Sequence, residues 1–309
     1  MKAIQYKTYG NSDVIEQVEV PMPSIRNEND VLIQIKAVGV NPIDVKIRMG
    51  FMKAVRPVEM PFTPGGEASG IIVAVGDHVS KFKVGDQVIA LTKTNAYAEY
   101  VTANENFVLL KPQGLSFEEA ASIGINIGTA QSVLFIVGKL EKGHRILIQG
   151  GAGAAGGAMI QLAKAAGAYV IATASGKGLE LAKSLGADEV IDYKSQDVAG
   201  LVKGIDLVAD TAGGEAQEKL FQVLKPGGKL LSIVIPPSQQ LAEQYNVEAR
   251  FVASDISSQT LQNGFELIEA VKFKPVVSKI FKLEAAASAQ DFLTAGGVNG
   301  KVVLVPANS

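Results

Sequence analysis

The sequence predicts an α/β protein in which a doubly wound parallel sheet is inserted into a β-rich domain. Three observations predict this fold. Strand-like and helical segments alternate through the middle of the chain, short strands separated by Pro and Gly dominate residues 1 to about 110, and strand-like sequence returns at the end. With 309 residues, of which 47% are hydrophobic, the chain is long enough for two domains.

The first part of the chain reads as short strands bounded by turn residues. We expect strands at 31–38, 69–75 and 87–91. From about Ser116 the pattern changes, and residues 117–121 and 129–137 read as helices.

The middle of the chain alternates strand and helix, which favours a parallel sheet with right-handed crossovers. Gly186 and the Pro226-Gly227-Gly228 run are the stop signals expected after helices. The predicted strands are 145–149, 169–173, 190–192, 207–210, 229–234 and 250–253, and the predicted helices are 155–166, 177–185 and 215–224.

Two further segments complete the prediction. Residues 236–246 are polar and poorly periodic, so they form either a lid or a surface loop. After a helix at 259–270, strands are expected at 276–281 and 301–305, and these resemble the first part of the chain more than the middle.

Composition excludes several classes of function. A net charge of −2 and a pI near 5.8 give no basic surface for nucleic acid or for an anionic membrane. The first residues alternate like a strand rather than a signal peptide, and we expect no apolar run long enough to span a membrane, so we expect a cytoplasmic protein. The chain has no cysteine, which removes disulfides, thiolate metal ligands and a cysteine nucleophile.

The strand at 145–149 runs directly into a glycine-rich turn. Gly151, Gly153 and Gly156 match the G-x-G-x-x-G pattern, in which glycines allow a tight turn, close approach to phosphate and close packing of helix on strand. The helix that follows offers unpaired amides and a positive dipole end to a pyrophosphate. This combination predicts a Rossmann dinucleotide site, and the alternative is a phosphate-free βα turn.

The segment about twenty residues after the glycines predicts which dinucleotide is bound. An NAD enzyme usually places Asp or Glu there, on the ribose 2′-hydroxyl. This chain has no acid between Ala172 and Lys177. Ser175 can donate a hydrogen bond to a 2′-phosphate and Lys177 supplies a compensating charge, so we expect NADPH.

Landmarks along the whole chain resemble a known family. In order, they are residues 39–44, 64–70, 84–88 and 96–101, the glycine turn, and residues 185–188, 224–228 and 300–304. This sequence is similar to zinc-free members of the medium-chain dehydrogenase/reductase superfamily, of the zeta-crystallin type of quinone oxidoreductase. The resemblance implies a GroES-like catalytic domain at 1–118 plus 272–309 and a Rossmann NADPH-binding domain at 119–271.

The resemblance also implies that no metal is bound. Zinc-dependent relatives carry Cys where this chain has Asn41, and His where it has Gly66. The two histidines, His78 and His144, lie in predicted turns, where a solvated role is the simpler interpretation. With no cysteine, a His and Cys site cannot form.

Two site residues follow from the resemblance. The amide of Asn41 is expected to face the nicotinamide and the substrate, where it would bind a carbonyl oxygen that gains negative charge, and Thr129 matches a threonine close to the nicotinamide. Simpler interpretations are a turn-forming Asn before Pro42 and a Thr at a helix N-terminus. Tyr193 is implied as a neighbour of the 2′-phosphate. The expected cofactor contacts are Gly151, Gly153, Ala154, Ala155, Gly156, Thr173, Ser175, Lys177, Tyr193 and Ile233.

The resemblance implies an NADPH-dependent reductase of quinones or other α,β-unsaturated carbonyl compounds. Many quinone reductases of this type have tyrosines in the segment after the Asn-Pro pair, whereas this chain has Lys46, Phe51 and Met52. Two alternatives stay open. One is an enoyl-thioester reductase, and the other is an NADPH-binding protein with a mainly structural or regulatory role.

Two remaining expectations concern assembly and proton supply. We expect a homodimer, because the apolar strand at 229–235 is predicted to lie at a sheet edge that a second copy would cover. Asp44 is expected to order its loop rather than act as an acid, because nothing in the sequence indicates the burial that would raise its pKa. Water would then protonate the reduced product.

Overall fold

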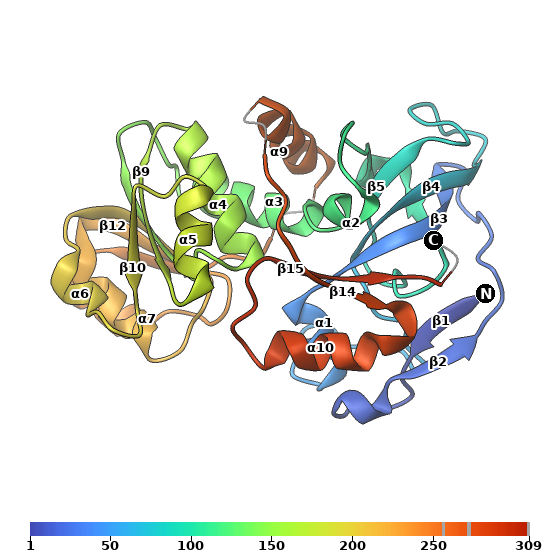
Figure 1. The fold of residues 1–309 in the computed structure, drawn as a ribbon, viewed down its shortest axis with the longest axis horizontal. Helices are drawn as coiled ribbons and strands as arrows, with labels where there is room; N and C mark the ends of the chain where they lie inside the picture. The colour runs from blue at the N-terminus through green and yellow to red at the C-terminus, as the bar shows by residue number, and fades with distance from the viewer. Residues whose placement is uncertain (255–256, 271–272, 308–309) are drawn as a thin grey trace. The chain divides into compact units, whose positions relative to one another are not determined.

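The computed structural model describes residues 1–254, 257–270 and 273–307, and these form two compact units (Figure 1). Unit 1 comprises Met1–Ile125 and Pro275–Ser309, and unit 2 comprises Asn126–Lys274. The predicted domain boundary at 271/272 lies outside the described residues. The functional assignment of the two domains stays a prediction.

Unit 2 contains a parallel sheet of six strands in the order β10-β9-β8-β11-β12-β13. The order reverses between β8 and β11, which is the arrangement of a doubly wound dinucleotide-binding sheet. The predicted α/β fold with this sheet is therefore confirmed. The strands are β8 (Arg145–Gln149), β9 (Tyr169–Ala174), β10 (Glu189–Asp192), β11 (Ile205–Asp210), β12 (Leu224–Ser232) and β13 (Glu248–Phe251).

The crossover helices bury apolar faces against this sheet. Helix α4 packs on β8 and β9, and helix α5 packs on β9 and β10. Met159 and Leu162 of α4 are buried, as the i, i+3 spacing predicts. The helices of unit 2 are α4 (Ala154–Ala165), α5 (Lys177–Ser184), α6 (Val198–Leu201), α7 (Ala216–Lys219, with a 3₁₀ turn at Leu220–Val223), α8 (Gln239–Tyr245) and α9 (Ser258–Ala270).

Two expectations for unit 2 are wrong. Strand β12 lies between β11 and β13, so the edge strands are β10 and β13, and the strand predicted at 229–235 is not at an edge. Residues 236–246 are not an irregular surface loop, because they contain helix α8, and the lid interpretation stays a prediction. The Ser238 hydroxyl accepts a hydrogen bond from Leu241 N and so caps this helix, a signal that the polar composition obscured.

Helix α3 (Gly124–Gln131) begins five residues before the predicted start at 129 and continues into a π-helical turn, Ser132–Val137. Gly124 and Gly128 lower the helix propensity of this segment, so a prediction from sequence places the start too late.

Helices α2 and α3 and the π-helical turn together form one apolar stretch, Phe117–Val137. Among the described residues, it is the one stretch that is long and apolar enough to cross a membrane by length and composition. Our expectation that no such run exists is wrong. Of its most apolar window, 78% is buried, as in a core helix.

Unit 1 is built on a seven-stranded sheet in the order β14-β15-β3-β4-β5-β7, with β6 paired to β3. Strands β14 and β15 come from the end of the chain, as predicted, and β15 pairs antiparallel with β3. The strands of this sheet are β3 (Asp30–Val40), β4 (Glu67–Val75), β5 (Gln87–Leu91), β6 (Tyr100–Asn104), β7 (Val108–Leu110), β14 (Val277–Lys282) and β15 (Lys301–Val305). Strands β1 (Lys2–Gln5) and β2 (Glu16–Glu19) pair in a separate two-stranded sheet.

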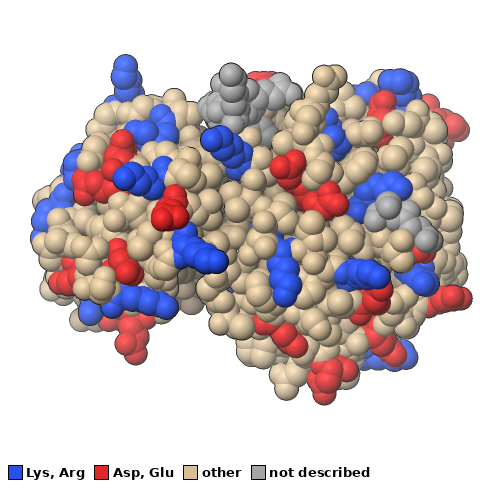
Figure 2. Space-filling view, viewed as in Figure 1, with Lys and Arg blue, Asp and Glu red and all other residues tan. Residues whose placement is uncertain are grey.

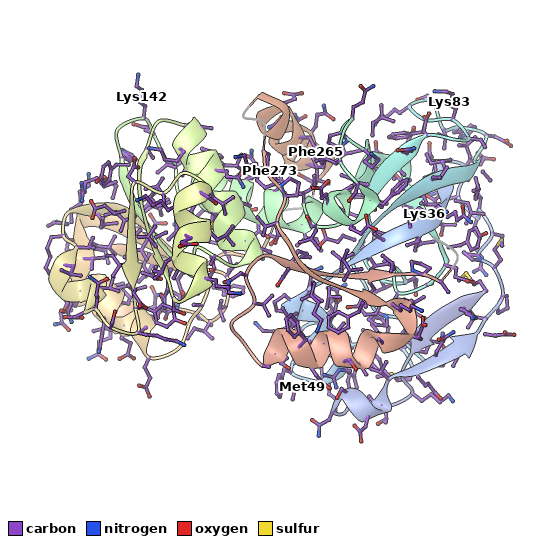
Figure 3. All side chains as sticks on the ribbon, viewed as in Figure 1. Lys36, Met49, Lys83, Lys142, Phe265 and Phe273 are labelled. Carbon is purple, nitrogen blue, oxygen red and sulfur yellow. The ribbon has the colours of Figure 1, made fainter. Side chains whose placement is uncertain are left out.

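The helices of unit 1 are short, and the side chains of each unit fill the space between its layers (Figure 3). Exposed lysines such as Lys83 and Lys142 extend outward (Figure 3). On the face shown in Figure 2, basic and acidic side chains are interspersed. The helices are α1 (Pro42–Arg48), α2 (Phe117–Ala120) and α10 (Ala286–Thr294), with 3₁₀ turns at Ser12–Val14, Glu105–Phe107 and Leu283–Ala285.

Candidate active site

The glycine turn between β8 and α4 has the geometry of a phosphate-binding turn. Helix α4 begins at Ala154, so the N–H groups of Ala154, Ala155 and Gly156 lie in its first turn, where no intrahelical acceptor exists. A Cβ on Gly156 would collide with the carbonyl oxygen of Gly150, whereas a Cβ on Gly153 would meet only that oxygen, at 3.4 Å. The turn therefore has no room for a side chain at Gly156, where the helix packs on the strand, but it leaves space beside Gly153.

Thr173 braces this turn from the neighbouring strand β9. Its hydroxyl accepts a hydrogen bond from Gly150 N at 3.1 Å, and its carbonyl accepts one from Gly151 N at 2.9 Å. Thr173 is buried, so it stabilises the conformation of the turn rather than lying on its exposed side. Gln149, the residue before the turn, has a buried side-chain oxygen with no hydrogen-bond partner among the described residues. The first-turn amides of α4, the space beside Gly153 and the unpaired oxygen of Gln149 are all suited to contact with a bound dinucleotide.

The residues predicted to select the cofactor lie together at the carboxyl ends of β9 and β10. The Ser175 hydroxyl donates a hydrogen bond to the Tyr193 hydroxyl at 3.2 Å. Tyr193 is 54% exposed, and Lys177 is exposed at the start of α5. The structure thus places two hydroxyls and an ammonium group at the end of the sheet, with no acid in the β9 segment that follows Ala172.

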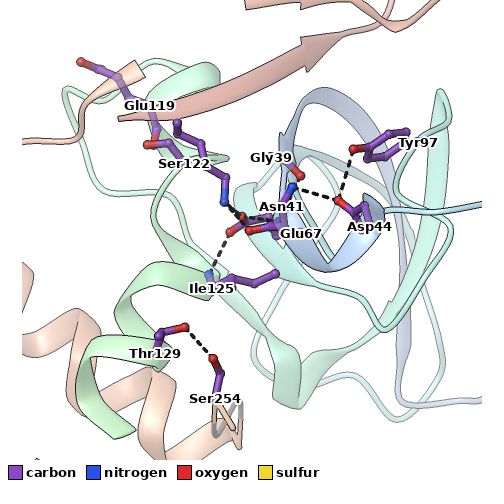
Figure 4. A network of polar contacts seen from close by, with 11 residues as sticks. Gly39, Asn41, Asp44, Glu67, Tyr97, Glu119, Ser122, Ile125, Thr129 and Ser254 are labelled. Carbon is purple, nitrogen blue, oxygen red and sulfur yellow. Dashed lines mark hydrogen bonds and ion pairs between the residues drawn. The ribbon is translucent and has the colours of Figure 1, made fainter. Parts of the chain in front are cut away.

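Asn41 lies in a buried polar network of unit 1 (Figure 4). Its side-chain nitrogen donates to Glu67 Oε1 at 3.0 Å and to the carbonyl oxygen of Gly39 at 3.2 Å, and its side-chain oxygen accepts from Lys301 Nζ at 2.6 Å. The carboxylate and the ammonium group fix the orientation of the amide, because a flipped amide would place like groups together.

The sequence did not identify Glu67 and Lys301 as site residues. Lys301 also pairs directly with Glu67 Oε1, and their side chains are 3% and 0% exposed. The other oxygen of Glu67 accepts a hydrogen bond from Ile125 N at 2.8 Å, in the first turn of α3. The carboxylate therefore caps this helix, which explains its start at Gly124. Both residues belong to landmark motifs, but no local pattern indicates that they pair.

Asp44 and Tyr97 extend the network. Asp44 accepts hydrogen bonds from Asn41 N at 2.9 Å and from the Tyr97 hydroxyl at 3.2 Å (Figure 4). Burial, above all, raises the pKa of Asp44 to about 6, against the hydrogen bond from Asn41 and the charge of Lys301. Burial, together with the charge of Asp44, also raises the pKa of Tyr97. Asp44 orders its loop as predicted, but the expectation that it is not buried is wrong.

Thr129 is buried in the second turn of α3, not at a helix N-terminus. Its hydroxyl lies 2.6 Å from that of Ser254, in the segment after β13 (Figure 4). Ile233, another expected cofactor contact, follows β12 and donates its N–H to the carbonyl oxygen of Asp210 at 3.1 Å. Unit 2 therefore brings expected cofactor residues to the carboxyl ends of its strands, and unit 1 holds Asn41.

The part of the chain that the structure describes contains no group of three or more His, Asp or Glu side chains that could hold a metal. The histidines are engaged elsewhere. His78 lies 3.0 Å from the carboxylate of Glu28 on the surface, and His144 Nδ1 accepts a hydrogen bond from Glu141 N.

Known proteins are similar over nearly the whole chain. Residues 27–133 match the family model of the alcohol dehydrogenase GroES-like domain, and residues 185–304 match that of zinc-binding dehydrogenases. The chain is 37% identical to a 2-methylene-furan-3-one reductase of Solanum lycopersicum (99% of this chain, 79% of the relative). It is 35% identical to an NADPH-dependent alkenal/one oxidoreductase of Arabidopsis thaliana (99% and 80%). The solved structure of the quinone oxidoreductase from Coxiella burnetii superposes with a TM-score of 0.88 at 31% identity, over 99% of both chains.

Proposed function

The chain belongs to the zinc-free quinone oxidoreductase family of the medium-chain dehydrogenase/reductase superfamily, and from this we propose that it is an NADPH-dependent reductase of α,β-unsaturated carbonyl compounds and quinones. The observation that carries the proposal is the acid-free end of β9, where Ser175, Tyr193 and Lys177 lie together beside the glycine turn. A carboxylate at this place would repel a 2′-phosphate, whereas these groups can bind one.

NADPH, when bound, supplies the hydride, so the protein's tasks are binding, orientation and electrostatic stabilisation. The amides of Ala154, Ala155 and Gly156 would hold the pyrophosphate at the start of α4. Lys177 would neutralise part of the charge on the 2′-phosphate. Thr129, buried on α3, is proposed to lie against the nicotinamide.

We propose that Asn41 binds the carbonyl oxygen of the substrate. Both of its N–H groups already donate, so this role requires one bond to be exchanged, and the bond to Gly39 is the longer at 3.2 Å. The ammonium group of Lys301 on the amide oxygen draws electron density from the amide, which strengthens its N–H donors. Such a donor stabilises charge that develops on the oxygen as hydride arrives.

Enals and enones are proposed as better substrates than quinones. Two relatives with 37% and 35% identity are named as a furanone reductase and an alkenal/one oxidoreductase. The segment after Asn41 carries Phe51, which is 71% exposed, and the half-buried Met52 in place of the tyrosines typical of quinone reductases. These side chains present apolar surface without a hydroxyl for a quinone oxygen.

A homodimer is also proposed, with a corrected interface. One edge of the unit 2 sheet is β13, where Phe251 is 49% exposed and backbone groups lack a strand partner on one side among the described residues. A second copy that pairs with this edge across a two-fold axis would cover them. A cytoplasmic location is proposed as well, supported by the balanced charge of the chain.

The decisive experiment measures NADPH oxidation with enals, enones, quinones and enoyl thioesters in parallel. We expect turnover with the enals and enones, weaker turnover with quinones and none with enoyl thioesters. Turnover confined to enoyl thioesters would favour the enoyl-thioester alternative. Tight NADPH binding without turnover on any substrate would favour a structural or regulatory role.

A further inference from the structure

Strand β11 ends at a buried carboxyl group, and no cationic side chain in the described part of the chain forms an ion pair with it. Asp210 is 1% exposed, and four neutral donors surround it. Its Oδ1 atom accepts from the N–H groups of Ala212 and Gly213 at 3.0 and 2.7 Å, and its Oδ2 atom accepts from the Gln217 amide and the Ser232 hydroxyl, both at 2.8 Å. A buried carboxyl group needs hydrogen-bond partners for its oxygens, so Asp210 and its four donors hold one another in place.

These hydrogen bonds join two loops. Residues 211–214 follow β11, and residues 233–235 follow β12, which pairs with β11 along its length. The Ser232 hydroxyl, while it donates to Asp210, accepts from Val234 N at 3.2 Å and Ile235 N at 3.4 Å. The Gln217 amide that contacts Asp210 also donates to the carbonyl oxygen of Ile235 at 3.3 Å. The Asp210 carboxyl group is thus hydrogen-bonded, directly or through Ser232 and Gln217, to both loops.

The two loops lie on the other side of the strand-order reversal from Ser175 and Tyr193. Asp210 is the register partner of Gln149, and the Thr211 hydroxyl donates to the Gln149 carbonyl oxygen at 2.6 Å, directly before the glycine turn. In a doubly wound sheet the dinucleotide lies across this reversal, with one mononucleotide on each side. The Ser175 side would hold the adenosine half, which leaves the loops beyond β11 and β12 for the nicotinamide half.

We propose that Asp210 is a positioning residue that fixes loops 211–214 and 233–235 as the platform for the nicotinamide riboside of NADPH. The inference rests on the proposed function. It predicts that a change at Asp210 weakens contacts to one half of the cofactor and spares the other. A merely structural role for Asp210 would weaken binding of both halves together.

The test compares NADPH with 2′-phospho-ADP, which keeps the adenosine half and the pyrophosphate and lacks the whole nicotinamide riboside. Dissociation constants of both are measured by calorimetry for the wild type, Asp210→Asn and Ser232→Ala. Asp206→Asn is the matched control, because Asp206 lies at the opposite end of β11 and pairs with Lys225. We expect Asp210→Asn and Ser232→Ala to weaken NADPH binding by about tenfold or more, while the affinity for 2′-phospho-ADP changes by less than about twofold. Asp206→Asn should leave both constants unchanged.

Equal losses for both ligands, or no loss for either, would overturn the inference while wild-type NADPH binding leaves the proposed function standing. If the wild type binds neither ligand, the proposed function fails and the inference fails with it. Circular dichroism shows whether Asp210→Asn folds, and if it does not, Ser232→Ala decides the outcome in the same way.

Discussion

The ammonium group of Lys301 lies 2.6 Å from the side-chain oxygen of Asn41, although 260 positions separate the two residues in the chain. The contact forms because β15, from the end of the chain, pairs with β3 immediately before Asn41. Asn41 therefore owes its orientation to a residue of the last strand. Because Lys301 is buried with Glu67, loss of one partner would leave an uncompensated charge in the interior.

Asn41→Ala should lower turnover of an enone by about 10²-fold or more, with the loss mainly in kcat, because the lost donor acts on charge that develops in the transition state. NADPH affinity should stay near the wild-type value. The structure adds an expected loss of about 1–3 kcal/mol in the free energy of unfolding, because Lys301 and Glu67 each lose a buried hydrogen-bond partner. Steady-state kinetics and urea unfolding check both. Wild-type turnover in this variant would show that Asn41 does not stabilise the carbonyl oxygen during hydride transfer.

NADPH should bind more tightly than NADH by about 1–3 kcal/mol, from charge-assisted contacts to the 2′-phosphate. Lys177→Glu should erode this preference and leave NADH affinity intact. Lys183→Glu is a matched control, since it makes the same charge change at the other end of helix α5. Fluorescence titration measures the affinities. Equal affinities for the two nucleotides in the wild type would contradict the cofactor assignment.

Asp44→Asn should change stability in a pH-dependent way. The folded-state pKa of Asp44, about 6, lies above its ordinary value of 3.8, so the native state holds this proton more tightly than the unfolded state. The resulting stabilisation is fully present below about pH 4 and is lost as the pH rises through about 6. Asn stays neutral throughout. The variant should therefore gain about 1–3 kcal/mol relative to the wild type between pH 5 and pH 8.

Urea unfolding at several pH values measures this difference. Asp86→Asn is the comparison, because hydrogen bonds from Lys83 lower the pKa of Asp86 and its titration falls below this range. A flat difference between Asp44→Asn and the wild type across the range would show that Asp44 stays charged in the native state.

Activity should not depend on a metal, because Asn41 and Gly66 occupy the positions of zinc ligands in zinc-dependent relatives and the chain has no cysteine. Chelator treatment should leave turnover unchanged, and elemental analysis of the purified protein should find no stoichiometric zinc. Zinc at one equivalent, with activity lost on chelation and restored by zinc, is the contrary result.

Light scattering at micromolar concentration should give the mass of a dimer. Phe251→Asp, at the exposed edge strand β13, should shift the protein toward monomer, because a charge there opposes strand pairing between copies. Phe51→Asp is the control, since Phe51 is similarly exposed and lies outside the sheet edge. A monomer mass for the wild type counts against the proposed dimer.

Local patterns predicted the strands best. Strands β5, β8 and β15 have the predicted bounds, because each is an apolar run closed by turn residues. Helix α1 was missed, since a helix of seven residues that begins at a proline shows little periodicity, and a hydrogen bond to Asp44 stabilises its first turn. The start of α3 depends on Glu67 from another strand, and the edge position of β13 depends on sheet order. Such contacts between distant segments have no local signal.

The candidate site divides in the same way. The glycine turn and Ser175 were predictable because phosphate binding needs particular residues at fixed spacings. The pairing of Lys301 with Glu67 was not, because 234 positions separate them and each residue alone reads as an ordinary surface charge.

The difference between Gly153 and Gly156 limits how this chain can diverge over evolutionary time. An alanine at 156 would force apart the turn and the helix, so it should impair folding itself. A Cβ at 153 meets only the carbonyl oxygen of Gly150, at 3.4 Å, so an alanine fits the turn and would obstruct the approach of a phosphate. A lineage released from the need for catalysis could therefore accept the second change at little cost in stability. One methyl group at 153 would give a folded descendant that has become a scaffold instead of an enzyme.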